Sequence, residues 1–497
     1  MRQSWLAVAL GGVLVQAGPC FAQEGNSACC SELNAKLAGK VHLPSTQGYN
    51  ASMEGFWTLQ ATFDTPTCVV VPTTAEDVSA AVKTLVAGSC QFSVKGGGHT
   101  AFAGAASISD GIQIDMTSMN SVSVSSDKSK ASIGAGARWL TVYQALESQG
   151  LMVAGGRDSD VGVGGLILGG GYSWFTSKRG FVADGLLNIE LVTADGETIN
   201  VNAEEHADLF VGLKGGGNNF GIVTRFDLPT FAFDKMWGGQ KVYSNDTTDA
   251  QIKAFVNFND NAHTDLHANL INYFSYDSKS KEHIVFNVID YNIPVENAPI
   301  YDELNAIPGV TVDTMRIEKL SSFTEELSSA TQRNRNIFLT ITFENDADMY
   351  RKAVDISNSH LKPFLDTPGL IWSLLFQPIP TVVTDVSKQT GGNVLGLENN
   401  KKNQILYLLY LTWTDEADDE ALHTAAYDTI DEIKAESIKA GKASPYIYLN
   451  YAGEFQDVIT GYGPENAAKL AALSAKYDPN GVFQKLVPGG WKVRPVA

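Results

Sequence analysis

Apolar residues change their spacing several times along the first hundred positions. A β-branched run at 67–71 is followed by apolar residues at helical spacing over 78–85, and a second apolar strand comes at 92–94. Thr73 and Glu76 have the spacing of a capping box at the start of the helix. The pattern predicts a β-α-β unit, in which ligands bind beyond the carboxyl ends of the strands.

The same reasoning predicts the elements of the next hundred residues. Asp195-Gly196, between two strand-like runs, is typical of a hairpin turn. We expect strands at 112–115, 121–124, 131–133 and 222–226, helices at 139–146 and 207–213, and a hairpin joining 186–193 to 197–201.

Beyond Pro229 the pattern changes to longer β-like runs and more highly charged helices. Strands are expected at 284–289, 337–343 and 405–413, followed by an acidic amphipathic helix over 415–438. This indicates a second, mixed α/β domain that ends near Ala443. The remaining segment predicts an aromatic strand at 446–451 and a helix around 467–477.

Three glycine-rich loops interrupt the first half of the chain. They lie at 96–98, directly before His99, at 155–171 and at 214–221. Glycines let backbone N–H groups approach negative oxygens, so phosphate is the expected guest, and the middle loop holds too many glycines for a regular element. A chance histidine beside a glycine turn is the alternative reading of the first loop. Three such loops together favour one extended ligand.

Composition and charge narrow the possible partners and the location. The formal net charge of −19 argues against a nucleic-acid partner. A basic start, an apolar run and small residues up to Ala22 indicate a signal peptide over 1–22. We therefore expect a secreted protein with no membrane segment in its mature form.

Four cysteines remain after that segment, an even number that suits an oxidising compartment. Because neighbouring cysteines rarely bond to each other, Cys29 and Cys30 are expected to reach Cys68 and Cys90, with the pairing open. Sequons at Asn50 and Asn245 predict glycosylation at exposed sites. The scattered histidines and the lack of a His-Glu-x-x-His or Cys-x-x-Cys motif give no support to a metal site.

Two nucleotide-binding motifs fail on spacing. The dinucleotide fingerprint Gly-x-Gly-x-x-Gly meets Ile167 after Gly162 and Trp139 after Gly134, where a glycine is required. A Gly-x-x-x-x-Gly-Lys-Ser/Thr loop is also missing from the sequence. With these two motifs excluded, the ligand that the glycine-rich loops still favour is one with a pyrophosphate and a long flat ring.

Five motifs in order carry a family resemblance over nearly the whole mature chain. Together they resemble the berberine-bridge-enzyme-like branch of the vanillyl-alcohol-oxidase flavoproteins. The resemblance implies an α+β fold: a PCMH-type FAD-binding domain in two parts, 23–230 and 444–497, and a mixed α/β substrate-binding domain with an antiparallel sheet, 231–443. The motifs are Gly96-Gly97-Gly98-His99, the glycine run from Gly162 to Gly171, Lys214-Gly215-Gly216-Gly217-x-x-Phe220-Gly221-Ile222-Val223, Tyr448-x-Asn450-Tyr451 and Tyr477-Asp478-Pro479.

The resemblance also implies how FAD is held. His99 is expected to bond covalently to the flavin 8α-methyl group. Many relatives use a second tether, a cysteine, where this chain has Asp158, so a single tether is implied. The implied cofactor-binding residues are Lys95, Gly96, Gly97, Gly98, His99, Gly104, Gly156, Asp158, Ser159, Gly162, Gly164, Gly165, Gly170, Gly221, Ile222, Val223, Tyr448 and Asn450.

Tyr448 is the candidate catalytic base, because relatives that oxidise sugars have a tyrosine at this position. Its pKa, ordinarily about 10, would have to be lowered by neighbouring charge or hydrogen bonds. Core packing in an aromatic segment is the alternative role. Arg157 is a further candidate for contact with flavin or substrate, and Trp372, Phe376 and Gln377 are candidates for the pocket wall, with surface exposure and core packing as the respective alternatives.

The expected function is that of a secreted FAD-dependent oxidase. It takes hydride from an alcohol-type small molecule, such as a carbohydrate, and reduces O2 to H2O2. The first alternative is a tailoring oxidoreductase of secondary metabolism. The second, from another class, is a secreted protein that binds flavin or another ligand without catalysis.

Overall fold

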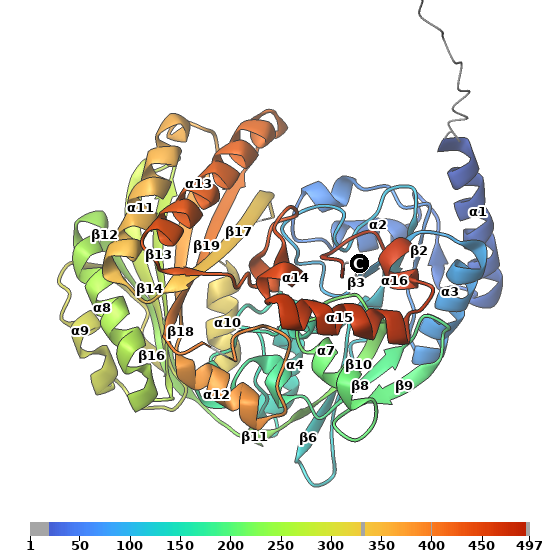
Figure 1. Ribbon diagram of the computed structural model, residues 1–497, viewed down its shortest axis with the longest axis horizontal. Helices are drawn as coiled ribbons and strands as arrows, with labels where there is room; N and C mark the ends of the chain where they lie inside the picture. Colours follow the sequence, from blue (N-terminus) through green and yellow to red (C-terminus); the bar gives the residue numbers. More distant parts are fainter. Residues whose placement is uncertain (1–18, 330–332, 399, 494–497) are drawn as a thin grey trace, which may run out of the picture.

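The computed structural model describes residues 19–329, 333–398 and 400–493; the expected signal peptide lies largely outside these residues. Figure 1 shows two lobes, which we call the first lobe (residues 19–232 with 445–493) and the second lobe (236–444). The boundaries of the FAD-binding and substrate-binding domains expected from the sequence remain predictions. Among the described residues, no helix combines the length and the apolar character that crossing a membrane requires.

A four-stranded sheet, in the order β1-β2-β4-β3, begins the first lobe. Strands β2 and β3 each pair in parallel with β4, and α3 joins β2 to β3, which confirms the predicted β-α-β unit. The capping box lies one residue later than predicted: Thr74 is the N-cap and Asp77 its partner. The bounds are β1 Val41–His42, β2 Cys68–Val70, α3 Ala75–Gly88, β3 Phe92–Lys95 and β4 Ile112–Asp115.

A five-stranded antiparallel sheet, in the order β5-β6-β10-β8-β9, completes the β-structure that carries the glycine loops. The predicted hairpin is the pair β8–β9. Strands β7 and β11 form a separate two-stranded antiparallel sheet. The bounds are β5 Val122–Val124, β6 Lys130–Gly134, α4 Trp139–Glu147, β7 Leu151–Met152, α5 Val163–Leu168, α6 Thr176–Arg179, β8 Asn188–Val192, β9 Thr198–Val201, α7 Ala207–Leu213, β10 Ile222–Pro229 and β11 Phe231–Ala232.

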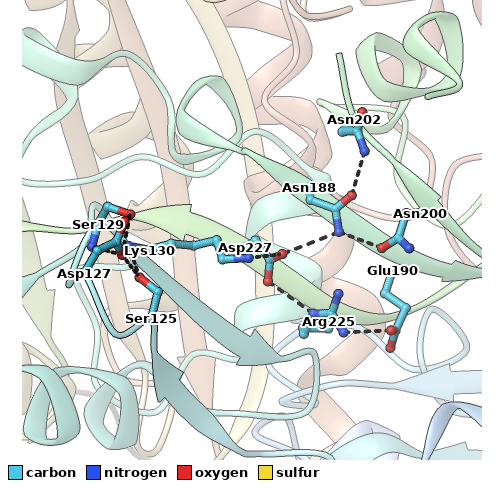
Figure 2. A network of polar contacts seen from close by, with 10 residues as sticks. All are labelled: Ser125, Asp127, Ser129, Lys130, Asn188, Glu190, Asn200, Asn202, Arg225 and Asp227. Carbon is cyan, nitrogen blue, oxygen red and sulfur yellow. Dashed lines mark hydrogen bonds and ion pairs between the residues drawn. The ribbon is translucent and has the colours of Figure 1, made fainter. Parts of the chain in front are cut away.

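A polar network ties this five-stranded sheet together (Figure 2). The buried carboxylate of Asp227 accepts hydrogen bonds from Lys130 at 3.2 Å and from Arg225 at 3.1 Å. Arg225 also pairs with Glu190 at 2.7 Å. At the turn between β5 and β6, hydrogen bonds, the largest from Ser125, lower the pKa of Asp127 to about 2.

The second lobe contains a large antiparallel sheet in the order β15-β12-β14-β13-β18-β19-β17-β20, with β16 also paired to β12. Its strands are β12 Met236–Ser244, β13 Ala268–Asp277, β14 Glu282–Tyr291, β15 Val310–Asp313, β16 Arg316–Glu318, β17 Arg335–Glu344, β18 Ile371–Ile379, β19 Gln404–Trp413 and β20 Ala443–Ser444. Its helices are α8 Thr248–Asn261, α9 Asp302–Asn305, α10 Leu320–Ser329, α11 Ala347–Leu361, α12 Thr381–Gln389 and α13 Asp419–Lys439. Figure 1 shows α8, α9, α11 and α13 along the outer side of this sheet, so its inner face is left for the first lobe.

After β20 the chain returns to the first lobe, where α14 (Val458–Gly461), α15 (Pro464–Tyr477) and α16 (Val482–Lys485) lie (Figure 1). The predicted strand at 446–451 is wrong. These residues form an extended segment and a short 3-10 turn, Leu449–Tyr451. Their aromatic side chains pack into the core beneath the glycine loops. The alternation of aromatic and other residues in this segment therefore reflects core packing and not pairing with a neighbouring strand.

Two disulfides, Cys29–Cys90 and Cys30–Cys68, attach α1 (Pro19–Lys36) to the first sheet. This confirms that the neighbouring cysteines bond to Cys68 and Cys90, and it resolves the pairing. The sequon residues Asn50, within α2 (Gln47–Glu54), and Asn245 are both exposed.

Candidate functional site

A cavity of about 550 Å³ runs from the glycine loops to the inner face of the large sheet. Both lobes and the C-terminal segment line it. On the first lobe the wall includes glycines of all three loops together with larger side chains such as Trp57 and Arg157, and on the second lobe it includes residues of β13, β14, β17, β18 and β19. A ligand in this cavity would therefore have its polar part among N–H groups and its far end against the sheet.

The first loop is delivered by β3 and packs backbone to backbone on the second loop. A Cβ atom on Gly97 would fall on the backbone of Gly162, and one on Gly162 would fall on that of Gly97. Gly98 has a φ of +69°, a region that favours glycine. Glycine is therefore required at all three positions, and the close approach brings two loops to one side of the ligand.

His99 stands at the end of this loop, half-buried and bordering the cavity. Its ring stacks on the indole of Trp57, with centroids 4.5 Å apart and planes 12° apart. Among the described residues, Nε2 of His99 has no hydrogen-bond partner. Burial lowers the pKa of His99, although Asp158 and Asp160 act in the opposite direction. The imidazole is thus neutral at physiological pH, the form in which a ring nitrogen is nucleophilic.

The second loop contains a helix, contrary to the expectation of irregular structure. Helix α5 begins after Gly162 and buries Val163 and Ile167. A Cβ on Gly164 would lie 2.8 Å from the carbonyl oxygen of Ala135, so glycine lets the turn pack on the neighbouring strand end. The apolar residues between the glycines pack into the core, and this packing stabilises the short helix α5 despite its glycines.

Arg157, from the same loop, is buried with 8% of its surface exposed and lines the cavity. Its Nη2 donates to Oε1 of Gln377 at 2.5 Å and to Oη of Tyr451 at 2.8 Å. The guanidinium lies over the ring of Tyr172, 4.6 Å from its centroid. The alternative of a surface-exposed arginine is wrong, because the loop turns this side chain inward.

The hydroxyl of Tyr448 is fixed by two donors. The N–H of Tyr172 donates to it at 2.9 Å, and Nδ2 of Asn450 donates at 3.0 Å. Asn450 also donates to the carbonyl of Leu166 at 3.0 Å, which anchors its amide. The hydroxyl oxygen thus accepts twice, and Tyr448 borders the cavity.

The pKa of Tyr448 is raised, not lowered as the base role required. Burial is the main cause and Tyr451 adds to it, while Asn450, Arg157 and the N–H of Tyr172 act in the opposite direction. In this state of the site, the tyrosine is a neutral phenol.

The inner face of the sheet shows which residues of β18 face the ligand. Ser373 and Leu375 line the cavity, whereas Trp372 and Phe376 point to the helices on the other side. The indole of Trp372 donates to Ser357 of α11 at 2.8 Å. Trp372 and Phe376 are therefore core residues, and Gln377 acts on the site through Arg157.

Most of the residues implied for cofactor binding meet in this cavity. Those lining it are Gly96, Gly97, Gly98, His99, Asp158, Gly162, Gly164, Gly165, Gly221, Ile222, Val223, Tyr448 and Asn450. Those outside its lining are Lys95, Gly104, Gly156, Ser159 and Gly170. Lys95 is buried instead against Asp115, with Nζ 3.0 Å from the carboxylate.

Several lining residues were missed by the sequence reasoning. These cavity-lining residues are Trp57, Tyr172 and the strand residues Tyr273, Phe286 and Tyr410. No local motif marks them. Successive residues of a strand point to opposite faces of the sheet, but the sequence does not say which face meets the ligand.

The residues present fit an FAD. The close-packed glycines leave backbone on one side, the stacked neutral imidazole has an unpaired nitrogen, and the cavity extends from Asn450 to residues of the large sheet. Among the described residues, no cluster of histidine, cysteine and carboxylate side chains could hold a metal ion.

Comparison with known proteins agrees with this fit. Residues 66–202 match the family model described as an FAD binding domain. The chain is 37% identical over 472 residues to the FAD-dependent monooxygenase sdcF of Emericella nidulans, covering 94% of this chain and 98% of the relative. It is 32% identical over 481 residues to the FAD-dependent monooxygenase drtC of Aspergillus calidoustus, covering 95% of this chain and 91% of that one.

Solved structures show the same fold at lower identity. Glucooligosaccharide oxidase from Acremonium strictum, described with a 6-S-cysteinyl, 8α-N1-histidyl FAD, superposes with a TM-score of 0.75 at 21% identity, over 94% of this chain and all of that one. A BBE-like protein of Physcomitrella patens gives a TM-score of 0.76 at 17% identity, over 94% of this chain and 100% of that chain. The chain belongs to the same family of FAD-dependent oxidoreductases as these relatives, and it shares the fold of the berberine-bridge-enzyme-like flavoproteins.

Proposed function

We propose that this FAD-dependent oxidoreductase is an oxidase that tailors a small, largely apolar alcohol. In the overall reaction, an alcohol carbon gives up two electrons and two protons to become a carbonyl, and O2 takes them up as H2O2. FAD, when bound, supplies the two-electron acceptor between them. The protein supplies binding, orientation and proton transfer.

The observation that carries this proposal is the double hydrogen bond onto the Tyr448 hydroxyl. Donors from Tyr172 and Asn450 stabilise negative charge on that oxygen, which is what a phenol needs in order to accept a proton from a substrate. Burial opposes ionisation, so the hydroxyl is protonated at neutral pH. Tyr448 is proposed to take the hydroxyl proton as the hydride leaves the same carbon.

A covalent link through His99 is part of the proposal. The unpaired Nε2, the position of the ring at the cavity wall and the neutral form all support a nitrogen that is free to bond. Asp158 borders the cavity, and the family resemblance implies that many relatives have a cysteine tether at this position, so one tether is proposed here. The glucooligosaccharide oxidase, with its histidyl FAD, offers a precedent on this fold.

The wall of the cavity favours an apolar substrate over a carbohydrate. Sugars are held by many hydrogen-bonding side chains, whereas the central row of the sheet here places Phe286, Tyr273, Leu375 and Leu408 side by side. The names of the relatives, FAD-dependent monooxygenases, fit the tailoring alternative better than the carbohydrate one.

Secretion is proposed on the two disulfides, which form and persist in oxidising compartments. Sequencing of the N-terminus of exported protein would test it. A start near residue 23 supports the proposal, and retention of the protein in the cell with free thiols contradicts it.

The experiment for the function is a screen of the purified holoenzyme without air. Aryl alcohols, apolar polyols and glucooligosaccharides are each added, and loss of the yellow absorbance is recorded before air is admitted and peroxide is measured. The proposal expects bleaching by an aryl alcohol, with stoichiometric peroxide on reoxidation. Bleaching by none of them would favour the non-catalytic alternative, and bleaching by sugars alone would restore the carbohydrate hypothesis.

A further inference from the structure

We infer that Lys492, in the C-terminal segment 487–493, holds the negatively charged pyrophosphate of FAD. This role requires only that the chain bind FAD, as its family does, and it does not depend on which alcohol is oxidised. It adds to the cofactor end of the cavity a residue that none of the five sequence motifs contains.

The segment 487–493 forms part of the cavity wall next to the glycine loops. Gly490 and Trp491 line the cavity. A Cβ atom on Gly489 would fall on the carbonyl oxygen of Gly104, so glycine lets the segment pack on the loop that follows the first glycine run. The segment therefore closes the side of the cavity where backbone N–H groups favour an anion.

Asn219, a buried residue of the third loop, fixes the backbone on both sides of Lys492. Its Nδ2 donates to the carbonyl oxygen of Trp491 at 2.9 Å, and its Oδ1 accepts from the N–H of Val493 at 3.2 Å. The same Nδ2 donates to the carbonyl oxygen of Gly216, within its own loop, at 2.8 Å. The backbone of Lys492 is thus held in place by a glycine loop.

The amine of Lys492 reaches the cavity wall and is only partly satisfied by the protein. Nζ donates to Oδ1 of Asn218 at 3.2 Å, and Asn218 itself lines the cavity. Among the described residues, no other group accepts a hydrogen bond from this amine, and no carboxylate forms an ion pair with it. Since an ammonium has three N–H donors, two of them are left for a ligand.

The charge of this amine is not compensated in the cavity wall. Burial lowers the pKa of Lys492 to about 7, and the charge of Asp478 acts in the opposite direction. The carboxylate of Asp478 is used elsewhere, because it accepts hydrogen bonds from the N–H groups of Val482 at 2.7 Å and Phe483 at 2.8 Å. An anion beside Lys492 would therefore favour the protonated amine.

Three other cations close to the glycine loops already have partners. These pairs are Lys95 with Asp115 at 3.0 Å, Arg138 with Asp160 at 2.9 Å, and Lys214 with the carbonyl oxygen of Thr390 at 3.2 Å. Lys492 differs from them in having donors left over at the cavity wall.

Three charged side chains line the cavity itself, namely Arg157, Asp158 and Asp277. The two carboxylates repel phosphate, and neither of them acts on the charge of Lys492. Of the two cations, Arg157 donates to a glutamine of β18 on the large sheet, whereas Lys492 is held by a glycine loop. Phosphate on the glycine-loop side of the cavity is therefore favoured beside Lys492.

The pyrophosphate is the part of FAD that fits this place. It is negatively charged at neutral pH, and backbone N–H groups of glycine loops together with a lysine are a common combination for binding phosphate. The flavin ring, by contrast, is proposed to lie at His99 and Tyr448. When FAD is bound, Lys492 supplies a positive charge and hydrogen-bond donors to its phosphate oxygens.

The first test is ³¹P NMR of the wild-type holoenzyme, which observes the phosphorus atoms of bound FAD directly. The pyrophosphate has no proton to lose at alkaline pH, so a shift of its resonances there reports a neighbouring amine. We expect at least one resonance to move as Lys492 loses its proton. The movement should come well above pH 7, because bound phosphate raises the pKa of the amine toward its ordinary value of about 10.

Two variants and a control assign this movement. Lys492→Gln should abolish it, and Lys492→Arg, whose charge does not titrate in this range, should keep the resonances near their neutral-pH positions. Lys485→Gln is the matched control, because Lys485 is exposed on α16 and bonds to the carbonyl oxygen of Asn480 at 2.8 Å; it should titrate as the wild type does. If Lys492→Gln does not fold, as judged by circular dichroism, Lys492→Met gives the same comparison.

A second readout separates a contact with phosphate from a role in folding. In the full chain with His99→Ala, FAD is expected to exchange, and FAD and riboflavin, which has the same ring and no phosphate, are titrated separately. Adding Lys492→Gln should weaken FAD binding roughly tenfold or more and leave riboflavin binding within about twofold. A residue that only holds the segment 487–493 in place would weaken the binding of both ligands.

Three results would overturn the inference. The phosphorus resonances of the wild type do not move at alkaline pH; or those of Lys492→Gln move as the wild-type resonances do; or Lys492→Gln changes the affinities for FAD and riboflavin equally or changes neither. None of these results depends on whether an alcohol bleaches the flavin, so failure here and failure of the proposed function are separate.

Discussion

The imidazole of His99 stacks on the indole of Trp57 at a centroid distance of 4.5 Å. Trp57 also contacts Phe338 and Tyr410 of the large sheet, at 5.4 and 6.0 Å. One side chain thus joins the proposed point of flavin attachment to the wall of the substrate cavity, and it fixes the plane of the imidazole.

We predict that Trp57→Leu lowers the fraction of protein carrying covalent flavin several-fold, because the unstacked imidazole is free to rotate out of line. Trp57→Phe, which retains a ring at the same place, is the matched control and should keep most of the flavin. The measurement is flavin fluorescence per protein in an acid-denatured gel band. Full loading of the leucine variant would show that the stack does not position His99.

Tyr448→Phe removes the proposed proton acceptor and keeps the ring. We expect the rate of flavin reduction by an accepted alcohol to fall roughly 10²- to 10⁴-fold, with substrate affinity little changed. Rapid-mixing spectroscopy measures both. A loss of affinity with an unchanged reduction rate would assign Tyr448 to binding alone.

The raised pKa of Tyr448 also gives a direction to the pH profile. A base that is protonated at neutral pH becomes active as pH rises, so the reduction rate of the wild type should increase toward alkaline pH. In Tyr448→Phe this increase should disappear. A rise of equal size in the variant would mean that another group titrates.

Asp227→Asn tests the network drawn in Figure 2. Burial raises the pKa of Asp227, but hydrogen bonds and the charges of Arg225 and Lys130 outweigh it, so the pKa is lowered overall. A carboxylate with a lowered folded-state pKa contributes stability above its unfolded pKa of about 4 and loses that contribution as pH falls through the folded value.

The variant should therefore reduce the free energy of unfolding by about 1–3 kcal/mol near neutral pH, with the difference shrinking in acid. Chemical denaturation at several pH values measures this. In Asp227→Asn, Arg225 keeps its ion pair with Glu190. Glu190→Gln removes that second pair and leaves Asp227 in place, so it serves as a control with a smaller expected effect. A constant difference at all pH values would show that the charge of Asp227 is not responsible.

Replacing Cys30 and Cys68 together by alanine removes one of the two attachments of α1. Loss of a closed loop of this kind is expected to cost about 2–4 kcal/mol, seen as a lower midpoint in thermal unfolding. Flavin loading should be unchanged, since neither cysteine lines the cavity. An unchanged midpoint would mean that the Cys29–Cys90 bond alone holds α1.

Local patterns predicted much of the fold because their cause is local. The β-α-β unit, the hairpin about Asp195-Gly196 and the long strands follow from periodicity and turn chemistry, and the neighbouring cysteines limited the disulfides. The capping box was off by one residue because two adjacent threonines precede acidic residues with the same spacing.

What the sequence could not predict depends on tertiary contacts. Tyr446 and Tyr448 alternate like strand residues, but they pack beneath the glycine loops and have no neighbouring strand. The face of β18 that meets the ligand is decided by where α11 packs, so Trp372 could not be told from Ser373. Trp57 lies in a segment without a motif, and only the fold brings it to His99.

The proposed attachment of the flavin to His99 is tested most directly by the mass of the peptide that contains this residue. Purified protein is denatured in acid, digested and analysed by mass spectrometry, with His99→Ala and the exposed control His263→Ala in parallel. We predict one peptide carrying FAD on His99 in the wild type and in His263→Ala, and free FAD or none in His99→Ala. Wild-type protein that releases all of its FAD on denaturation, with an unmodified His99 peptide, would contradict the account.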